Sequence, residues 1–285
     1  MSAPALDDIV ARVSTLPPLP HTVHHLLSVI SDPSSSLAEI VDSIRYDQTL
    51  TAEVLRLCNS AYFGLARTVE TLDDAVRLLG TAKVLQLVVA AHTRVMLSRP
   101  QVGYGLPAGA LWQHSVAVAL AGQRLGQRMR LSQAGLVFTA GLLHDVGKVV
   151  LNEFVAEEYA EIFAHVNRER CTFAEAEARV LGFTHPDVGS RLAEAWNLPP
   201  AITRCIRYHH DPQSLPNPDP LVDAVHLADA VCIALGIGAG DDGLAYRAAA
   251  PILRRYALAE ADLELIGADT VAELKSVQAV LAPKR

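Results

Sequence analysis

The feature that most constrains the fold of this chain is a helical periodicity that recurs along almost its whole length. Apolar residues fall three or four positions apart, as at Val84, Leu87, Val88 and Ala91. No run alternates apolar and polar residues with the period of two that marks a half-buried strand. Ala and Leu dominate an apolar fraction of 51%, whereas aromatic residues make up 5%, and this mixture favours helices over sheets. The sequence therefore predicts an all-α fold.

Local signals at helix ends support this prediction. The segments Ser36–Glu39 and Thr172–Glu175 have the capping-box pattern, in which the first side chain and the last can satisfy each other's free backbone donors. Thr71, which precedes Leu-Asp-Asp, is a weaker version of the same signal. Gly80 and Gly182 each follow an apolar run at a position where a helix is expected to end.

Breaks in the pattern predict two parts. The clearest Pro/Gly break lies at residues 98–107. A second loop, at 211–220, carries four prolines, but helical periodicity resumes directly over 221–235. We therefore expect an N-terminal helical subdomain over residues 1–100 and a second subdomain over 105–285 that includes the C-terminal extension.

Charge and cysteine usage exclude several classes of protein. The formal net charge is −7, and the one notable basic pair, Arg254-Arg255, reads as a solvated helix face, so neither nucleic-acid binding nor docking on an anionic membrane is expected. No stretch reaches about 18 uninterrupted apolar residues, and the N-terminus lacks the pattern of a secretory signal. The scattered cysteines form no CxxC pair and are expected to be reduced. We expect a soluble cytoplasmic protein.

Histidine and aspartate give the functional signal. His144-Asp145 lies in the apolar segment Gly141–Lys148, where we expect a continuous helix. An ionised carboxylate in such a place needs a partner. The two side chains could simply bond to each other, or a divalent metal could bind both, because imidazole and carboxylate together suit Mn, Fe, Ni or Zn.

Further residues of the same types follow a fixed order along the chain. Each has an ordinary structural interpretation as well: His114 as a core histidine, His185 as a helix cap, His209-His210 as a solvated helix end, and Asp229 as the partner of an arginine. Taken together, however, the order His…His-Asp…His…His-His…Asp resembles that of the HD-domain phosphohydrolases.

The N-terminal half narrows the resemblance to the HDOD family. Residues 16–20 (Leu-Pro-Pro-Leu-Pro), 46–51, 55–64 and 75–80 are similar to successive motifs of that family, although Gln48 stands where the family has proline. The similarity continues through residues 112–115, the His144-Asp145 segment, His185, 196–199 and His209-His210, and so covers roughly residues 15–212.

The resemblance implies a multi-helix HD-type bundle packed against the N-terminal helical subdomain, in a bacterial signalling protein. It also implies a site for one or two divalent ions (Fe, Mn, Ni or Zn). By position, its ligands are His114, His144, Asp145, His185, His209, His210 and Asp229. Asp145 would bridge two ions and Lys148 would contact a substrate phosphate. Ala110 stands where some relatives carry a further acidic ligand, so no third ion is implied.

The sequence leaves two functions open. The chain lacks the Gly-Tyr-Pro loop that follows the double histidine in cyclic-di-GMP phosphodiesterases, which argues against hydrolysis of that compound. The first hypothesis is a regulatory signalling module that acts on another signalling protein, with a nucleotide as a conceivable ligand. The alternative is a metal-dependent phosphohydrolase, with Asp145 and Lys148 as its catalytic residues.

Overall fold

The computed structural model describes residues 48–59, 68–238, 246 and 248–281. Every regular element in these ranges is a helix, and a single isolated β-bridge joins Gln101 and Leu106. The α-helices are α4 (Gln48–Cys58), α5 (Leu72–Leu79), α6 (Thr81–Leu97), α7 (Ala110–Arg128), α8 (Ala134–Leu143), α9 (Val146–Glu169), α10 (Phe173–Val180), α11 (His185–Ala195), α12 (Pro200–Tyr208), α13 (Pro220–Ala234), α14 (Ala250–Arg255) and α15 (Glu260–Leu281). Two short 3₁₀ turns, η1 (Val102–Tyr104) and η2 (Pro212–Ser214), lie in the loops. The all-α prediction is confirmed.

Most of the predicted helix ends are found where the sequence places them. Thr172 and Glu175 form a reciprocal capping box at the start of α10, and the Thr71 side chain accepts a hydrogen bond from the backbone of Asp74 at the start of α5. Gly80 ends α5 with φ 80°, and Gly182 follows α10 with φ 82°. The predicted Ser36–Glu39 box lies outside the described residues.

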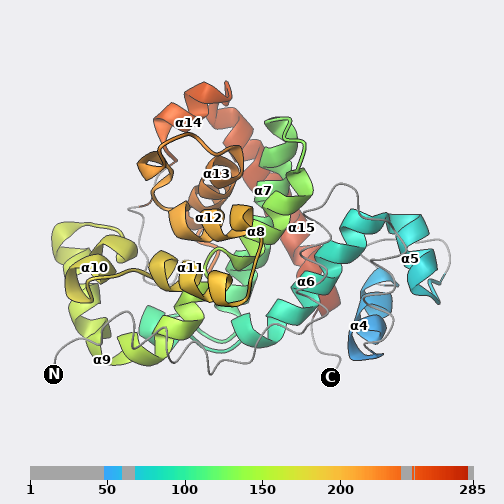
Figure 1. Ribbon diagram of the computed structural model, residues 1–285, viewed down its shortest axis with the longest axis horizontal. Coiled ribbons are helices and arrows are strands. Elements are labelled where there is room, and N and C mark those ends of the chain that lie inside the picture. Colours follow the sequence, from blue (N-terminus) through green and yellow to red (C-terminus); the bar gives the residue numbers. More distant parts are fainter. Residues whose placement is uncertain (1–47, 60–67, 239–245, 247, 282–285) are drawn as a thin grey trace.

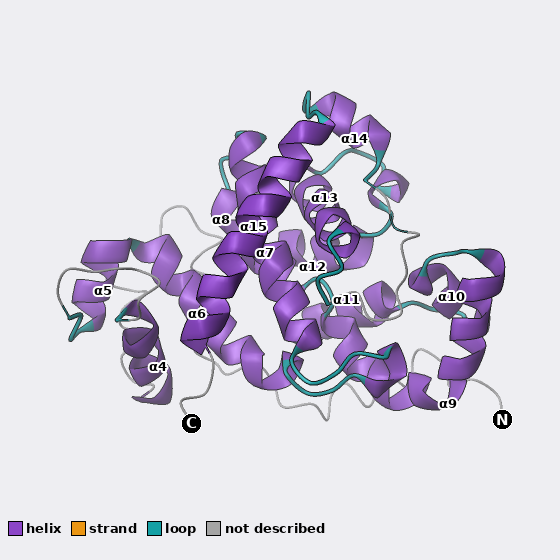
Figure 2. Cartoon of the chain, turned by 180° about the vertical axis from the view of Figure 1, so that it is seen from behind, coloured by secondary structure: helices purple, strands orange, loops and turns teal. Residues whose placement is uncertain are grey.

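The larger core forms around α7. This helix packs against α8, α13 and α15 (Figures 1 and 2), and small residues allow the close approach. A Cβ at Gly126 would stand 3.3 Å from the Cα of Ala134, and one at Gly141 would stand 3.0 Å from the Cα of Ala119. Helices α10 and α11 pack against α9, and α12 packs against α8 and α11 and completes the bundle.

A second, smaller core joins α4, α5 and the first half of α6. It consists of Val54, Cys58, Val69, Leu72, Ala75, Val76, Val84 and Val88. From Val89 onward α6 belongs to the larger core. In Figure 1 α4 and α5 accordingly lie at one end of the molecule, beyond α6. The boundary between subdomains at residues 100–105 stays a prediction.

The segment Ala134–Asn152 is long and apolar enough to cross a membrane, but 83% of it is buried inside the bundle. Its burial explains it as part of the core. The segment is also not one helix, because a turn at residues 144–145 divides it into α8 and α9. The four cysteines are free and buried.

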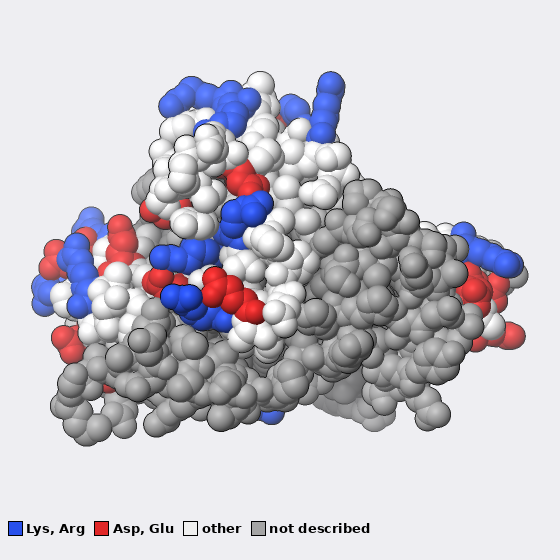
Figure 3. All heavy atoms as spheres, viewed as in Figure 1, with Lys and Arg blue, Asp and Glu red and all other residues white. Residues whose placement is uncertain are grey.

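Charged side chains of both signs are interspersed on the described part of the face in Figure 3. Ion pairs account for this mixture on α11 and α12: Arg207 lies 2.7 Å from Asp187, and Arg204 lies 2.9 Å from Asp219. Arg255, which the sequence placed on a solvated face with Arg254, reaches Asp223, which is only 2% exposed, at 2.5 Å. Arg255 is therefore not simply solvated, because it pairs with a buried carboxylate of α13.

Candidate metal centre

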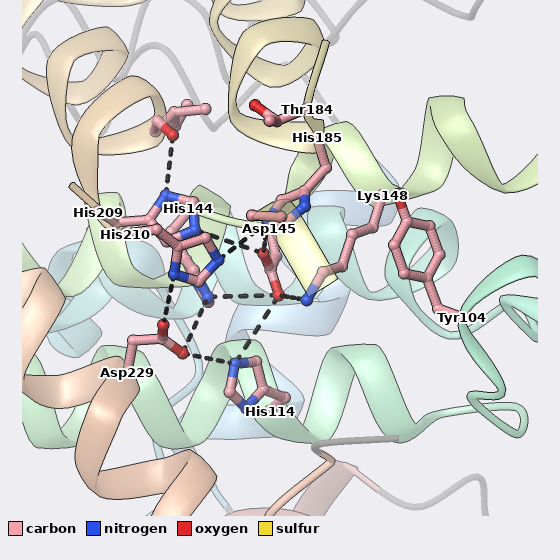
Figure 4. A network of polar contacts seen from close by, with 12 residues as sticks. Tyr104, His114, His144, Asp145, Lys148, Thr184, His185, His209, His210 and Asp229 are labelled. Carbon is pink, nitrogen blue, oxygen red and sulfur yellow. Dashed lines mark hydrogen bonds and ion pairs between the residues drawn. The ribbon is translucent and has the colours of Figure 1, made fainter. Parts of the chain in front are cut away.

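The His-Asp pair lies at a break between two helices, not inside one helix as the sequence analysis predicted. Helix α8 ends at Leu143, and α9 begins at Val146. Asp145 has φ −98° and ψ 13°, outside the helical range, and this turns the chain. As a result the side chains of His144 and Asp145 both point into the centre of the bundle (Figure 4).

Gly147 allows a second helix to approach this break. A Cβ at Gly147 would collide with the carbonyl oxygen of His185 and would stand 2.7 Å from the amide nitrogen of Gly189. Helix α11 therefore crosses α9 in backbone contact, which brings His185, its first residue, to the His-Asp pair. Pro186 in the first turn and the capping box between Thr184 and Asp187 fix the start of α11.

The remaining predicted residues reach the same place from three other helices. His114 projects from the first turns of α7, His209 and His210 follow the last turn of α12, and Asp229 lies on α13. The structure thus brings together all seven residues that the order pattern had singled out (Figure 4).

Asp145 lies between two groups of ligands. Its Oδ1 is 3.3 Å from Nε2 of His185 and 3.6 Å from Nε2 of His209. Its Oδ2 faces the other way, 3.4 Å from Nε2 of His144 and 2.8 Å from Nζ of Lys148. One group consists of Asp145, His185, His209 and His210, and the other of His114, His144 and Asp229. Within each group the candidate ligand atoms lie within 4.8 Å of one another.

Asp229 completes the second group. Its Oδ1 lies 3.1 Å from Nε2 of His114 and 3.7 Å from Nε2 of His144, and its Oδ2 lies 3.4 Å from Nδ1 of His210. His210 in turn meets Nε2 of His185 at 3.1 Å, so the two groups are continuous.

Backbone carbonyls fix the tautomers of three histidines. Nδ1 of His114 bonds to the carbonyl of Ile237 at 2.8 Å, that of His144 to Gly141 at 2.7 Å, and that of His209 to Ile206 at 2.8 Å. A carbonyl only accepts, so each Nδ1 must carry the proton. In the neutral imidazole the lone pair is then on Nε2, which points into the cluster, the arrangement usual for histidines that bind metals.

The histidines of the cluster differ in the direction in which their pKa is shifted. Burial lowers the pKa of His209 to about 4 and lowers that of His210 well below its usual range, with nearby histidines adding to the effect. Burial acts in the same direction on His185 and His114, but Glu177 outweighs it and raises the pKa of His185 to about 9, and Asp229 raises that of His114. His209 and His210 are therefore neutral near pH 7 and available as ligands.

Both carboxylates are ionised in spite of their burial. Burial opposes the charge, but Lys148 and His144 hold the pKa of Asp145 well below its ordinary value. The hydrogen bond from His114 and the nearby histidines lower the pKa of Asp229 to about 2.

Several buried polar atoms of the cluster have no hydrogen-bond partner. They are Nε2 of His144, Oδ1 of Asp145, Nε2 of His209 and Nδ1 of His210. Unsatisfied buried polar atoms are rare in native proteins, and each calls for an explanation such as a bound ion. Imidazole nitrogens and carboxylate oxygens are suitable donors for a divalent transition metal, so the cluster could hold a metal ion.

Sequence reasoning missed four residues around the cluster. Glu177 binds His185, and Tyr104 binds Glu177. Nδ1 of His226 donates to the carbonyl of His209 at 2.7 Å, and the ring of Tyr246 stacks on that of His210 at 4.3 Å. No sequence spacing links any of these residues to the residue it contacts, so the contacts are visible only in the tertiary structure.

The fold and the cluster define an all-helical protein of the HD type with a buried site suited to metal. The HDOD domain family matches residues 16–212, and the chain belongs to this family. The motifs that carried the resemblance in the sequence cover almost the same range.

Solved structures agree with this assignment. An HDOD domain protein of unknown function from Geobacter sulfurreducens is 27% identical and has a TM-score of 0.76, with 97% of this chain and 98% of that one covered. A candidate phosphohydrolase from Shewanella amazonensis SB2B, 24% identical over 96% of this chain and 98% of that one, has a TM-score of 0.72. At that identity the second likeness shows the fold alone.

One relative is a longer protein. An uncharacterized protein of Treponema pallidum (strain Nichols) is 27% identical over 224 residues, which are 78% of this chain and 43% of that protein. The chain thus spans less than half the length of this curated relative.

Proposed function

We propose that this chain is a regulatory signalling module of the HDOD type whose buried cluster binds one or two divalent ions. The ligands would be His114, His144, Asp145, His185, His209, His210 and Asp229, and Fe, Mn, Ni or Zn would suit them. The chain would pass its state to another signalling protein in the cytoplasm of a bacterium.

The observation that carries the metal proposal is the pair of carboxylates surrounded by oriented imidazoles. Nδ1 of His114, His144 and His209 is held by a backbone carbonyl, so each Nε2 faces Asp145 or Asp229 and carries the lone pair when the imidazole is neutral. A divalent cation would be shared by both carboxylates and by the imidazole nitrogens around them.

Burial favours a regulatory role over turnover. The side chain of His210 is 11% exposed, and those of the other six residues are exposed by 3% or less. A phosphoester could reach the cluster only if the surrounding structure opened. A metal held in this way would serve to fix the relative positions of α7, α8, α11, α12 and α13, which each contribute a ligand or adjoin one.

The second candidate function is a metal-dependent phosphohydrolase, and the position of Asp145 favours it. The two oxygens of this carboxylate face different groups of ligands, as a bridge between two ions requires. Two divalent ions would supply charge stabilisation to a phosphoryl group and would acidify water. Lys148 would offer a cation to the phosphate after leaving Asp145, from which it lies 2.8 Å.

Elemental analysis tests the proposal. Protein purified without chelator or metal-affinity tag is compared with the His144→Ala/Asp145→Ala double variant and with His165→Ala, which changes a histidine of α9 outside the cluster. We expect near-stoichiometric metal in the parent and in His165→Ala, and its loss in the double variant. An absence of metal from the parent even after reloading would overturn the proposal.

Turnover separates the two functions. The metal-loaded protein is incubated with bis(4-nitrophenyl) phosphate, and we expect no release of nitrophenol above the rate of the Asp145→Ala variant. Release that depends on Asp145 would favour the phosphohydrolase.

A further inference from the structure

The loop between α6 and α7 reaches the outer side of the cluster of candidate metal ligands. Gln101 and Leu106 pair across it in both directions, at 2.9 and 3.1 Å, and the amide of Gly103 donates to Oδ1 of Asn152 on α9 at 2.9 Å. These bonds make residues 101–106 a compact hairpin fixed to α9. Its tip is exposed at Val102 (69%), whereas Tyr104 is only 2% exposed and points inward.

Tyr104 ends on a carboxylate that holds a proposed ligand. Its hydroxyl donates to Oε1 of Glu177 at 2.7 Å. Oε2 of Glu177 accepts two bonds from His185, one from the backbone amide and one from Nδ1, each 2.8 Å long. Glu177 is fully buried, so these contacts account for both of its oxygens. The chain of contacts runs from the hairpin to Nε2 of His185 through two residues.

The same ring also contacts the other side of the cluster. Nζ of Lys148 lies 5.7 Å from the centre of the Tyr104 ring while it is paired with Asp145, within the range of a cation–π contact. The rings of Tyr104 and His185 are nearly perpendicular, with their centres 6.2 Å apart (Figure 4). Tyr104 therefore touches the surroundings of two proposed ligands, His185 and Asp145.

We propose that Tyr104 and Glu177 are positioning residues that couple the 101–106 hairpin to the metal centre. Glu177 fixes the tautomer and the ring orientation of His185, and Tyr104 fixes Glu177. Metal binding then orders the hairpin and so changes the affinity of the hairpin for a partner. Since such coupling is reciprocal, a partner that binds the hairpin changes the affinity for metal by the same factor. The inference rests on the proposed metal binding and adds a route by which the metal state reaches the surface.

Chemistry explains why a carboxylate is needed at this position. A carboxylate behind a metal-binding histidine makes the imidazole a better donor, and loss of such an outer partner typically weakens metal binding 10- to 100-fold. A glutamine at position 177 would keep the shape but remove the charge. Removal of the Tyr104 hydroxyl would leave the charge of Glu177 in place but would no longer fix the orientation of its carboxylate.

The test measures metal affinity and hairpin order together. Zn²⁺ affinity is determined by competition with a chromophoric chelator for the parent, Tyr104→Phe and Glu177→Gln. We expect the affinity to fall about 10- to 100-fold in Glu177→Gln and about 3- to 10-fold in Tyr104→Phe, the effect of one buried hydrogen bond. Hydrogen exchange of amides 101–106 should slow on Zn²⁺ addition in the parent and much less in Tyr104→Phe.

Tyr256→Phe is the matched control. Its hydroxyl also bonds to a buried carboxylate, Asp223 at 3.0 Å, but away from the cluster. The visible spectrum of the Co²⁺-loaded protein gives a second readout that a general loss of stability would not move. We expect it to change in Glu177→Gln and to stay the same in Tyr256→Phe.

The outcomes are distinguishable. A parent that binds no Zn²⁺ overturns the proposed function and this inference with it. A parent that binds Zn²⁺ with the same affinity as Tyr104→Phe and Glu177→Gln overturns the coupling alone. Equal weakening in Tyr104→Phe and Tyr256→Phe would also overturn it, because the effect would then not be specific to the hairpin. If Glu177→Gln fails to fold, Tyr104→Phe, which keeps the aromatic ring, decides the matter.

Discussion

The contact between α9 and α11 makes Gly147→Ala a sharp test of the site's architecture. A methyl group at position 147 would collide with the carbonyl oxygen of His185 and lie 2.7 Å from the amide nitrogen of Gly189. Both obstacles are backbone atoms, so no side chain can rotate away. Helix α11 must move, and it carries the proposed ligand His185 as its first residue.

The size of the effect follows from this geometry. Ordinary contact begins at 3.4 Å, so even the amide of Gly189 must retreat by about 0.7 Å. Overpacking of this kind costs about 1–3 kcal/mol and occasionally more, and a rigid obstacle favours the upper end. At about 2–4 °C per kcal/mol, a cost of about 3 kcal/mol lowers the thermal midpoint by about 6–12 °C. Metal–ligand distances tolerate only about 0.2 Å, so metal affinity should fall as well.

Gly135→Ala is the matched substitution. Gly135 lies in α8, and a Cβ there would meet nothing within 4 Å. Because alanine favours a helix over glycine by about 1 kcal/mol, this variant should be as stable as the parent or more so. Thermal unfolding followed by circular dichroism, together with metal content after reloading, would compare the variants. If Gly147→Ala has the same thermal midpoint as Gly135→Ala and keeps its metal, the close crossing of α9 and α11 would be refuted.

Three further results are expected. Metal at about 100 times its dissociation constant stabilises the native state by about 2.7 kcal/mol, so a chelator should lower the thermal midpoint by several degrees; an unmoved midpoint in protein shown to have lost its metal would exclude this stabilisation. Burial raises the pKa of Cys205 and Cys232, so a thiol reagent at pH 8 should label them only after unfolding in guanidinium, and rapid native labelling would contradict their burial. Arg255→Ala leaves the buried Asp223 carboxylate without its ion pair and should lower the unfolding free energy in urea by about 1 kcal/mol, reduced by the exposure of Arg255; an unchanged midpoint would show that the pair contributes nothing.

The parts of the fold that could be predicted are those set by local bonds. The capping box at Thr172–Glu175 and the helix ends at Gly80 and Gly182 depend on residues no more than a few positions apart. The break between α8 and α9 has a weaker signal, because residues 141–148 contain no proline and the N-cap residue Asp145 makes no side-chain capping bond. Contact with α11 and the burial of two polar side chains account for it. Sequence patterns could not show these, so the His-Asp pair was placed inside a helix.

The site shows the same division. The ordered histidines and aspartates could be recognised because their order along the chain resembles that of a known class, and the structure brings them together. Glu177 and Tyr104 carry no such order. Glu177 lies eight residues before His185, across a helix end, and reads as one of the two glutamates of α10. Tyr104 lies in a Pro/Gly break that marked only a boundary.

The charge of the cluster explains why a bundle core should contain these residues at all. Asp145 and Asp229 are both ionised, and without metal they are balanced by Lys148 and by the raised pKa values of His114 and His185. Apolar residues of similar volume would often be as stabilising as such a buried ionic network, or more so, and they would leave no unsatisfied atoms. A divalent cation would supply the same positive charge from one point, displace the protons of the two histidines, and use the lone pairs that have no partner. The cluster is thus a poor solution for stability alone and a good one for a site that exchanges protons for metal.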